Sequence, residues 1–134
     1  MLASPRGQGS LRNRDGHSGV VSRVKRTRER IAKTEALFRN VNEEIREAST
    51  RFGSEIADFV CECGDPTCTE HIRVPLAEYE EVREDATTFV VQPGHVKGPV
   101  ERVVKCRPDY AVIEKLDRVL RRIVTRLNPR PETT

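Results

Sequence analysis

The chain has 134 residues, of which 36% are hydrophobic and 34% are charged, and its net charge at pH 7 is +3. It has no tryptophan, four phenylalanines and two tyrosines, so its core must be small. A bound structural metal ion would stabilise such a core. The sequence shows no signal-peptide pattern and no apolar run of the ~20 residues that span a bilayer. We therefore expect one cytoplasmic domain with tails, in which reducing conditions favour metal ligation by cysteine over disulfides.

Charge is distributed unevenly along the chain. Residues 1–30 contain eight basic and two acidic side chains, whereas residues 43–85 contain thirteen acidic and four basic ones. From residue 97 onward, the chain contains ten basic and five acidic side chains. The pattern predicts a basic head, an acidic middle and a basic end.

Residues 1–20 are rich in Gly, Ser, Arg and Asn and lack a hydrophobic period, which predicts a disordered basic tail. Residues 21–53 follow a seven-residue period and predict a long amphipathic helix that ends at Gly53. We expect this helix to pack on its own domain; pairing in a homodimer or with a partner's helix is the alternative. The period is carried by Val24, Ile31, Phe38, Ile45 and Phe52, with Thr27, Thr34, Val41 and Ala48 between them.

The hydrophobic pattern of residues 54–127 predicts an α+β domain with a small, mostly antiparallel sheet. A short helix is expected at residues 76–85, and a strongly amphipathic closing helix at residues 116–127. Residues 128–134 contain two prolines and are predicted to be a disordered tail. Strands are expected at residues 58–63, 72–76, 88–92, 100–106 and 110–114.

Three cysteines lie within eight positions, at Cys61, Cys63 and Cys68. Gly64 and the turn-forming Asp65-Pro66 supply the bend that brings three sulfurs to one ion. Zinc prefers four tetrahedral ligands of thiolate and imidazole type, so a structural zinc site is predicted, with iron as the alternative ion. Buried thiols without a metal, or a redox pair, would be the other interpretations.

The fourth ligand has more than one candidate. His71 lies three residues after Cys68, His95 follows Pro93-Gly94 in a predicted turn, and Cys106 is more distant. The acidic residues near the site are expected to form a solvated face rather than to support the ligands. These residues are Glu62, Asp65 and Glu70.

Ordered sequence blocks occur at residues 59–68 (FVCECGDPTC), 76–83 (LAEYEEVR) and 89–95 (FVVQPGH). Together with blocks at residues 35–45, 101–104 and 110–115, they resemble a family of small, mostly uncharacterised actinobacterial proteins. The resemblance implies a shared fold whose pattern includes the histidine of Pro-Gly-His, and it therefore favours His95 over His71. It implies no activity, and this chain departs from the pattern in its arginine-rich N-terminal tail and its basic final helix.

The predicted ligand set does not favour an enzyme. Three cysteines and a histidine leave no open position for water on the metal, and three thiolates make it a poor Lewis acid. The His-x-Glu partner of a zinc deaminase is absent from the sequence. We therefore expect a non-catalytic module.

Two classes of function remain for such a module. The first is a metal-stabilised adaptor or regulator that acts through protein–protein contacts. The second is a nucleic-acid-associated regulator, because flexible basic residues neutralise phosphates. The acidic middle and the shortage of aromatic residues for base stacking argue against the second class. Its contact residues would be Arg23, Lys25, Arg26 and Arg28.

Overall fold

The computed structural model describes residues 16–96, 98 and 100–130, and their side chains from Thr27 onward. It has the α+β architecture expected from the sequence. Residues 1–15 of the predicted basic tail lie outside the described residues, and residues 16–20 belong to the first helix. The elements in chain order are α1 (Gly16–Arg51), β1 (Ile56–Val60), β2 (His71–Pro75), α2 (Leu76–Arg83), β3 (Thr88–Val91), β4 (Glu101–Cys106), β5 (Ala111–Lys115) and α3 (Arg118–Arg126).

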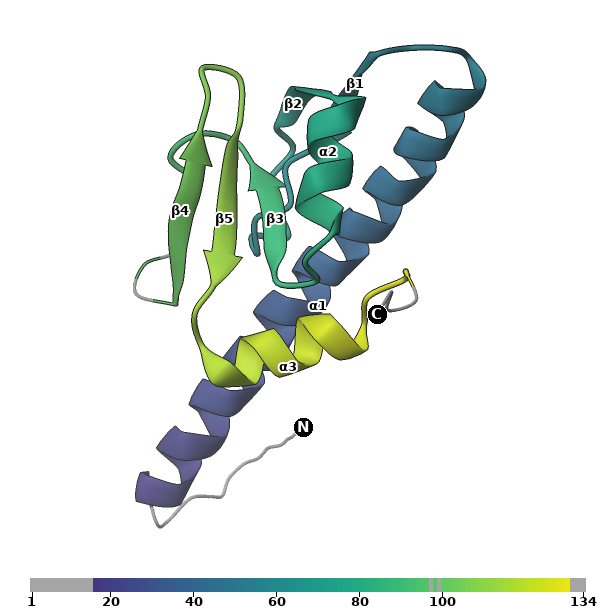
Figure 1. The fold of residues 1–134 in the computed structure, drawn as a ribbon. Coiled ribbons are helices and arrows are strands. Elements are labelled where there is room, and N and C mark those ends of the chain that lie inside the picture. The colour runs from purple at the N-terminus through teal and green to yellow at the C-terminus, as the bar shows by residue number, and fades with distance from the viewer. Residues whose placement is uncertain (1–15, 97, 99, 131–134) are drawn as a thin grey trace, which may run out of the picture.

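The strands form two antiparallel sheets (Figure 1). β1 pairs with β2, and β5 lies between β3 and β4 in a three-stranded sheet. The long α1 helix passes behind the sheets, and α3 crosses it at one end of the strands (Figure 1). The N-terminal turns of α1 project beyond α3, so this helix is longer than the domain that it supports.

The three-stranded sheet has an apolar cluster on each face, because successive side chains of a strand point to opposite sides. Phe89 and Val91 of β3 face α3 and the cysteines, whereas Val90 faces α2 and the β1–β2 pair. The first cluster contains Ala32, Cys61, Cys63, Phe89, Val91, Ala111, Ile113, Leu120, Ile123 and Val124. The second contains Ala57, Phe59, Ile72, Val74, Tyr79, Val82, Val90, Tyr110 and Val112.

The face that α1 buries only partly matches the apolar stripe that its seven-residue period indicates, because Ile31 and Ile45 pack against the two clusters but the most buried side chains are others. Glu35, Arg39 and Asn42 are fully buried, and Ala32 and Ala36 lie beside them. The domain presents backbone carbonyls to this face: Arg39 donates to the oxygens of Ala86 at 2.7 Å and Val124 at 2.8 Å. Polar side chains are needed there because buried backbone groups require hydrogen-bond partners.

A buried ion cluster joins α1 to the three-stranded sheet. The Lys115 ammonium lies between the carboxylates of Glu35 and Glu101, and the side chains of all three are almost completely buried. Burial raises the pKa of Glu35 from its ordinary value of 4.5 to about 7, although the Lys115 charge opposes this shift. Arg39 and Lys115 also lie over the ring of Phe89, at 4.7 and 5.7 Å from its centroid. Position 115 therefore holds the cation that compensates two buried acids.

The start of the predicted C-terminal tail is bound to the domain rather than disordered. Arg130 makes a two-atom contact with Glu80 at 3.0 Å, and it also binds Glu43. Glu43 accepts a further hydrogen bond from Tyr79 at 2.6 Å, and Asn128 accepts one from Arg83. These carboxylates of α1 and α2 attract Arg130 to the surface, while residues 131–134 lie outside the described residues.

Candidate metal centre

Four metal-ligand side chains converge where β1 and β3 end. Cys61, Cys63, Cys68 and His95 place their ligand atoms within 4.8 Å of one another. The Nδ1 atom of His95 lies 3.5 Å from Sγ of Cys61 and 3.7 Å from Sγ of Cys68. Cys61 and Cys63 are buried, and the other two are partly buried. The four ligand atoms are thus three sulfurs and one imidazole nitrogen.

The spacing of these atoms fits a tetrahedral ion. Zinc bonds of about 2.3 Å to sulfur and about 2.0–2.1 Å to nitrogen place tetrahedral S and N ligands about 3.6 Å apart. The two sulfur–nitrogen distances, 3.5 and 3.7 Å, lie on either side of this value. Three sulfurs and one nitrogen are also the donors that zinc favours in structural sites. The residues present therefore fit a zinc ion.

The loop between Cys61 and Cys68 is shaped by backbone and side-chain hydrogen bonds. The amide of Cys61 donates to the Glu70 carbonyl at 3.0 Å, which continues the β1–β2 pairing past the end of the strands. Asp65 then forms a tight turn: its carbonyl accepts from the Cys68 amide at 3.0 Å, and its carboxylate accepts from the Thr67 amide at 2.9 Å. This turn returns Cys68 to the other two sulfurs.

The Pro-Gly-His segment forms a second turn that delivers the imidazole. The amide of His95 donates to the Gln92 carbonyl at 2.9 Å, and Gly94 has a φ of 93°. Proline followed by a positive-φ glycine is the pattern of a type II turn, because L side chains are strained at that φ. The Gln92 amide also donates to Sγ of Cys61 at 3.1 Å, so one turn contacts two members of the group.

Burial affects the protonation of two thiols, Cys61 and Cys63. It raises the pKa of Cys61 well above its usual range, although the backbone amides of Gln92 and Cys63 donate to the sulfur and oppose the shift. Burial also raises the pKa of Cys63, against an opposing hydrogen bond from the Asp65 amide. A dication is the counter-charge that would hold such buried sulfurs as thiolates, and its binding would release protons.

Glu62 was expected to face solvent with the other nearby acids, and this expectation is wrong. Glu62 lies between Cys61 and Cys63 in the sequence, but its side chain points to the opposite side of the chain. There it is fully buried. Its carboxylate accepts from the Val90 amide at 2.9 Å and from Asn42 at 2.7 Å. Asn42 also exchanges two hydrogen bonds with the backbone of Val60, at 2.8 and 2.9 Å.

Glu62 and Asn42 therefore anchor the cysteine segment to α1 and β3. The alternation of a strand gives the sequence signal: when two cysteines point to one side, the residue between them points to the other. Nothing in the sequence indicated that this other side was interior. A buried carboxylate needs hydrogen-bond donors, and Asn42 with the Val90 amide supplies them. The pair fixes the backbone that carries Cys61 and Cys63.

Comparisons with protein-family models, curated proteins and solved structures find no match for this chain. The resemblance inferred from the ordered motifs therefore stays a prediction. Among the described helices, none is long and apolar enough to cross a bilayer.

The remaining predicted site residues lie away from the sulfurs. His71 is exposed at the start of β2, and Cys106 is exposed at the end of β4. Arg23, Lys25 and Arg26 belong to α1, but their side chains lie outside the described residues. Arg28 forms an ion pair with Asp117, the residue that caps α3, at 3.1 Å. This pairing leaves Arg28 less available for a phosphate.

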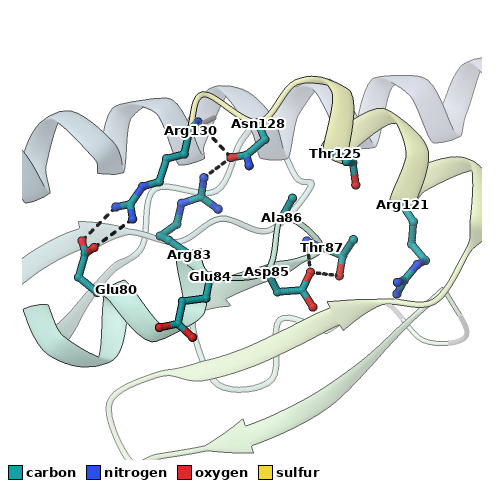
Figure 2. A pocket seen from close by; sticks show the side chains of 10 residues that line it. All are labelled: Glu80, Arg83, Glu84, Asp85, Ala86, Thr87, Arg121, Thr125, Asn128 and Arg130. Carbon is teal, nitrogen blue, oxygen red and sulfur yellow. Dashed lines mark hydrogen bonds and ion pairs between the residues drawn. The ribbon is translucent and has the colours of Figure 1, made fainter. Parts of the chain in front are cut away.

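A separate hollow of about 640 Å³ lies between α2, the turn that leads to β3, and α3 (Figure 2). Three arginines and three acids line it, so its formal charge is balanced. Arg130 pairs with Glu80, and Arg83 binds Asn128, as Figure 2 shows. Its balanced charge gives the hollow no strong preference for an anion or a cation, although the Nη1 atom of Arg83 is buried without a hydrogen-bond partner.

Replacing each histidine separately tests which one is the ligand. His95→Ala is expected to lower the bound metal per chain and to reduce thermal stability, because the fourth donor is lost. His71→Ala is the matched control, since this side chain is exposed and outside the group. Elemental analysis and thermal unfolding of both purified variants provide the measurement. Equal metal content in the two variants would contradict the assignment of His95.

Proposed function

We propose that the four-residue group binds one structural zinc ion through Cys61, Cys63, Cys68 and His95. The convergence of three sulfurs and one imidazole nitrogen carries this proposal. Four protein donors complete the tetrahedral shell, which is the arrangement of structural rather than catalytic zinc sites. The two most buried sulfurs belong to an apolar cluster, so the ion would stabilise the core directly.

The function that follows is that of a non-catalytic, zinc-stabilised adaptor or regulatory module that acts through protein–protein contacts in the cytoplasm. A closed shell leaves no metal position at which a substrate or a water could bind. The hollow of Figure 2 is lined by polar side chains of balanced charge, and none of the four metal-ligand residues lines it. In contrast, the long α1 helix presents a surface that suits helix–helix contacts.

A pull-down from cell extract, performed with and without nuclease, tests this function. The full-length protein serves as bait, and bound proteins are identified by mass spectrometry. Recovery of the same defined protein in both samples is the expected result. Recovery that disappears after nuclease treatment would contradict a protein-contact adaptor and would favour a nucleic-acid-associated regulator.

A further inference from the structure

The exposed side of α1, with Phe52 just after its end, carries an apolar stripe that the described domain leaves largely uncovered. Leu37, Val41 and Phe52 are 59%, 40% and 84% exposed. Thr34 and Ala48, which are partly buried, continue the stripe between and beside them. Val41, Ala48 and Phe52 belong to the seven-residue period, which is the pattern of helices that pair along a seam.

The stripe lies on the far side of the helix from the domain. At 3.6 residues per turn, its centre is rotated roughly 140° from the centre of the buried face around Glu35, Arg39 and Asn42. α1 therefore contacts its own domain through a largely polar face, with Ile31 and Ile45 also packed on the core, and leaves Leu37 and Val41 exposed. Exposed apolar side chains arranged along one helix face mark an interaction surface.

The charges beside the stripe change sign along the helix. Arg30 and Lys33 are exposed near the middle of α1, Glu44 and Glu47 are exposed closer to its end, and Arg51 follows them in the last turn. In an antiparallel pair of α1 helices centred between residues 38 and 39, Lys33 would lie at the level of Glu44 and Arg30 at the level of Glu47. A parallel pair would instead place equal charges side by side, which is unfavourable. These four charges are thus complementary to one another only in the antiparallel orientation.

We propose that the stripe on α1 is a dimer interface, occupied by the α1 helix of a second copy of this chain in antiparallel orientation. This inference deepens the proposed protein-contact function by naming the surface and the partner. In such a dimer Leu37 of each copy packs close to Val41 of the other. The two zinc-stapled domains lie on the outer sides of the helix pair, because each occupies the face opposite the stripe.

Sedimentation of the full-length, metal-loaded protein over a wide range of concentration tests the interface. The unmodified chain is expected to form a dimer. Leu37→Glu combined with Val41→Glu is expected to raise its Kd by on the order of 100-fold, because two apolar side chains in each copy lose their contacts. Val103→Glu is the matched control, since Val103 is a 46% exposed valine on β4, away from the stripe. It should leave the Kd unchanged.

Charge exchange tests the orientation. Lys33→Glu is expected to raise the Kd roughly tenfold, since it places like charges together twice in each dimer. Adding Glu44→Lys to that variant should restore the original Kd, because every pair is then reversed. A weakened dimer that Glu44→Lys fails to restore would overturn the antiparallel arrangement.

Two other outcomes overturn the inference. A chain that sediments as a monomer at every concentration would exclude the dimer, whether the stripe is covered by residues 1–15 or by another protein. A dimer unaffected by Leu37→Glu with Val41→Glu would exclude this surface. Metal content and circular dichroism are measured on each variant, so that unfolding is recognised. A monomer with full metal content would contradict the dimer but not the proposed function as a zinc-stabilised adaptor.

Discussion

Removal of the metal with a strong chelator is expected to unfold most of the domain. Structural zinc contributes on the order of 10 kcal/mol to the folding of small metal domains. Small domains have total unfolding free energies of about 5–15 kcal/mol, so the contribution of zinc is comparable to the total free energy of unfolding. Cys61 and Cys63 belong to the apolar cluster between the three-stranded sheet and α3, so loss of the ion loosens the core itself. Circular dichroism and thermal unfolding before and after chelation measure the effect.

The chelation experiment has an internal control and a matched variant. Returning zinc to the treated protein should restore the original transition, because the ligands remain in the chain. Cys106→Ala should respond to chelator like the unmodified protein, since Cys106 is exposed on β4 and outside the four-residue group. An unchanged melting temperature after complete chelation would contradict the structural role of the ion.

Replacing Lys115 with methionine is expected to cost about 3–5 kcal/mol of unfolding free energy, the range found when one partner of a buried ion pair is removed. Methionine preserves most of the side-chain volume but removes the cation between Glu35 and Glu101. Both carboxylates are buried away from solvent, so the loss of the compensating charge is costly. Denaturant unfolding at neutral pH measures the loss.

The pH dependence of the Lys115→Met variant gives a second readout. Burial already raises the pKa of Glu35 above its unfolded value, to about 7, so its folded form favours the proton. Such a group stabilises the fold fully below the unfolded pKa, and this stability is lost as the pH rises through the folded pKa. Removing the cation strengthens the effect. The deficit of the variant should therefore be larger at pH 8 than at pH 5.

Lys105→Met is the control for this substitution. Lys105 is only partly buried, and it faces the exposed Glu81 at 3.7 Å. An exposed ion pair contributes about 0–1 kcal/mol, so this variant should unfold almost like the original chain. Equal losses for Lys115→Met and Lys105→Met would contradict the assignment of Lys115 as the compensating charge.

The local patterns predicted the order and type of the elements well. Alternating apolar residues and the turn residues between them placed each strand within a few positions of its observed bounds. The crowded cysteines, with Gly64 and Asp65 behind them, predicted a bent loop that returns a third sulfur, and the structure has this bend. His95 could be favoured only through a resemblance. Its position depends on the contact between the cysteine segment and β3, where the Glu62 amide donates to the Val90 carbonyl at 2.8 Å, and the local sequence does not reveal this contact.

The interior polar contacts could not be predicted, because they join residues far apart in the chain. Glu35 and Lys115 are 80 positions apart, and Arg130 and Glu43 are 87 apart. Each looks locally like an ordinary charged surface residue, which is the usual place for such side chains. The same reasoning made the whole apolar stripe of α1 look like its buried face, whereas Val41 and Phe52 are exposed. Only the three-dimensional arrangement shows that polar groups occupy that face.

The most direct test is the elemental composition of the natively purified chain. A structural zinc site held by three thiolates and one imidazole requires a ratio of about one zinc ion per chain, without added metal. The Cys61→Ser, Cys68→Ser double variant should fall far below this ratio. A purified, folded protein that contains no stoichiometric transition metal would contradict the proposal that zinc stabilises the core.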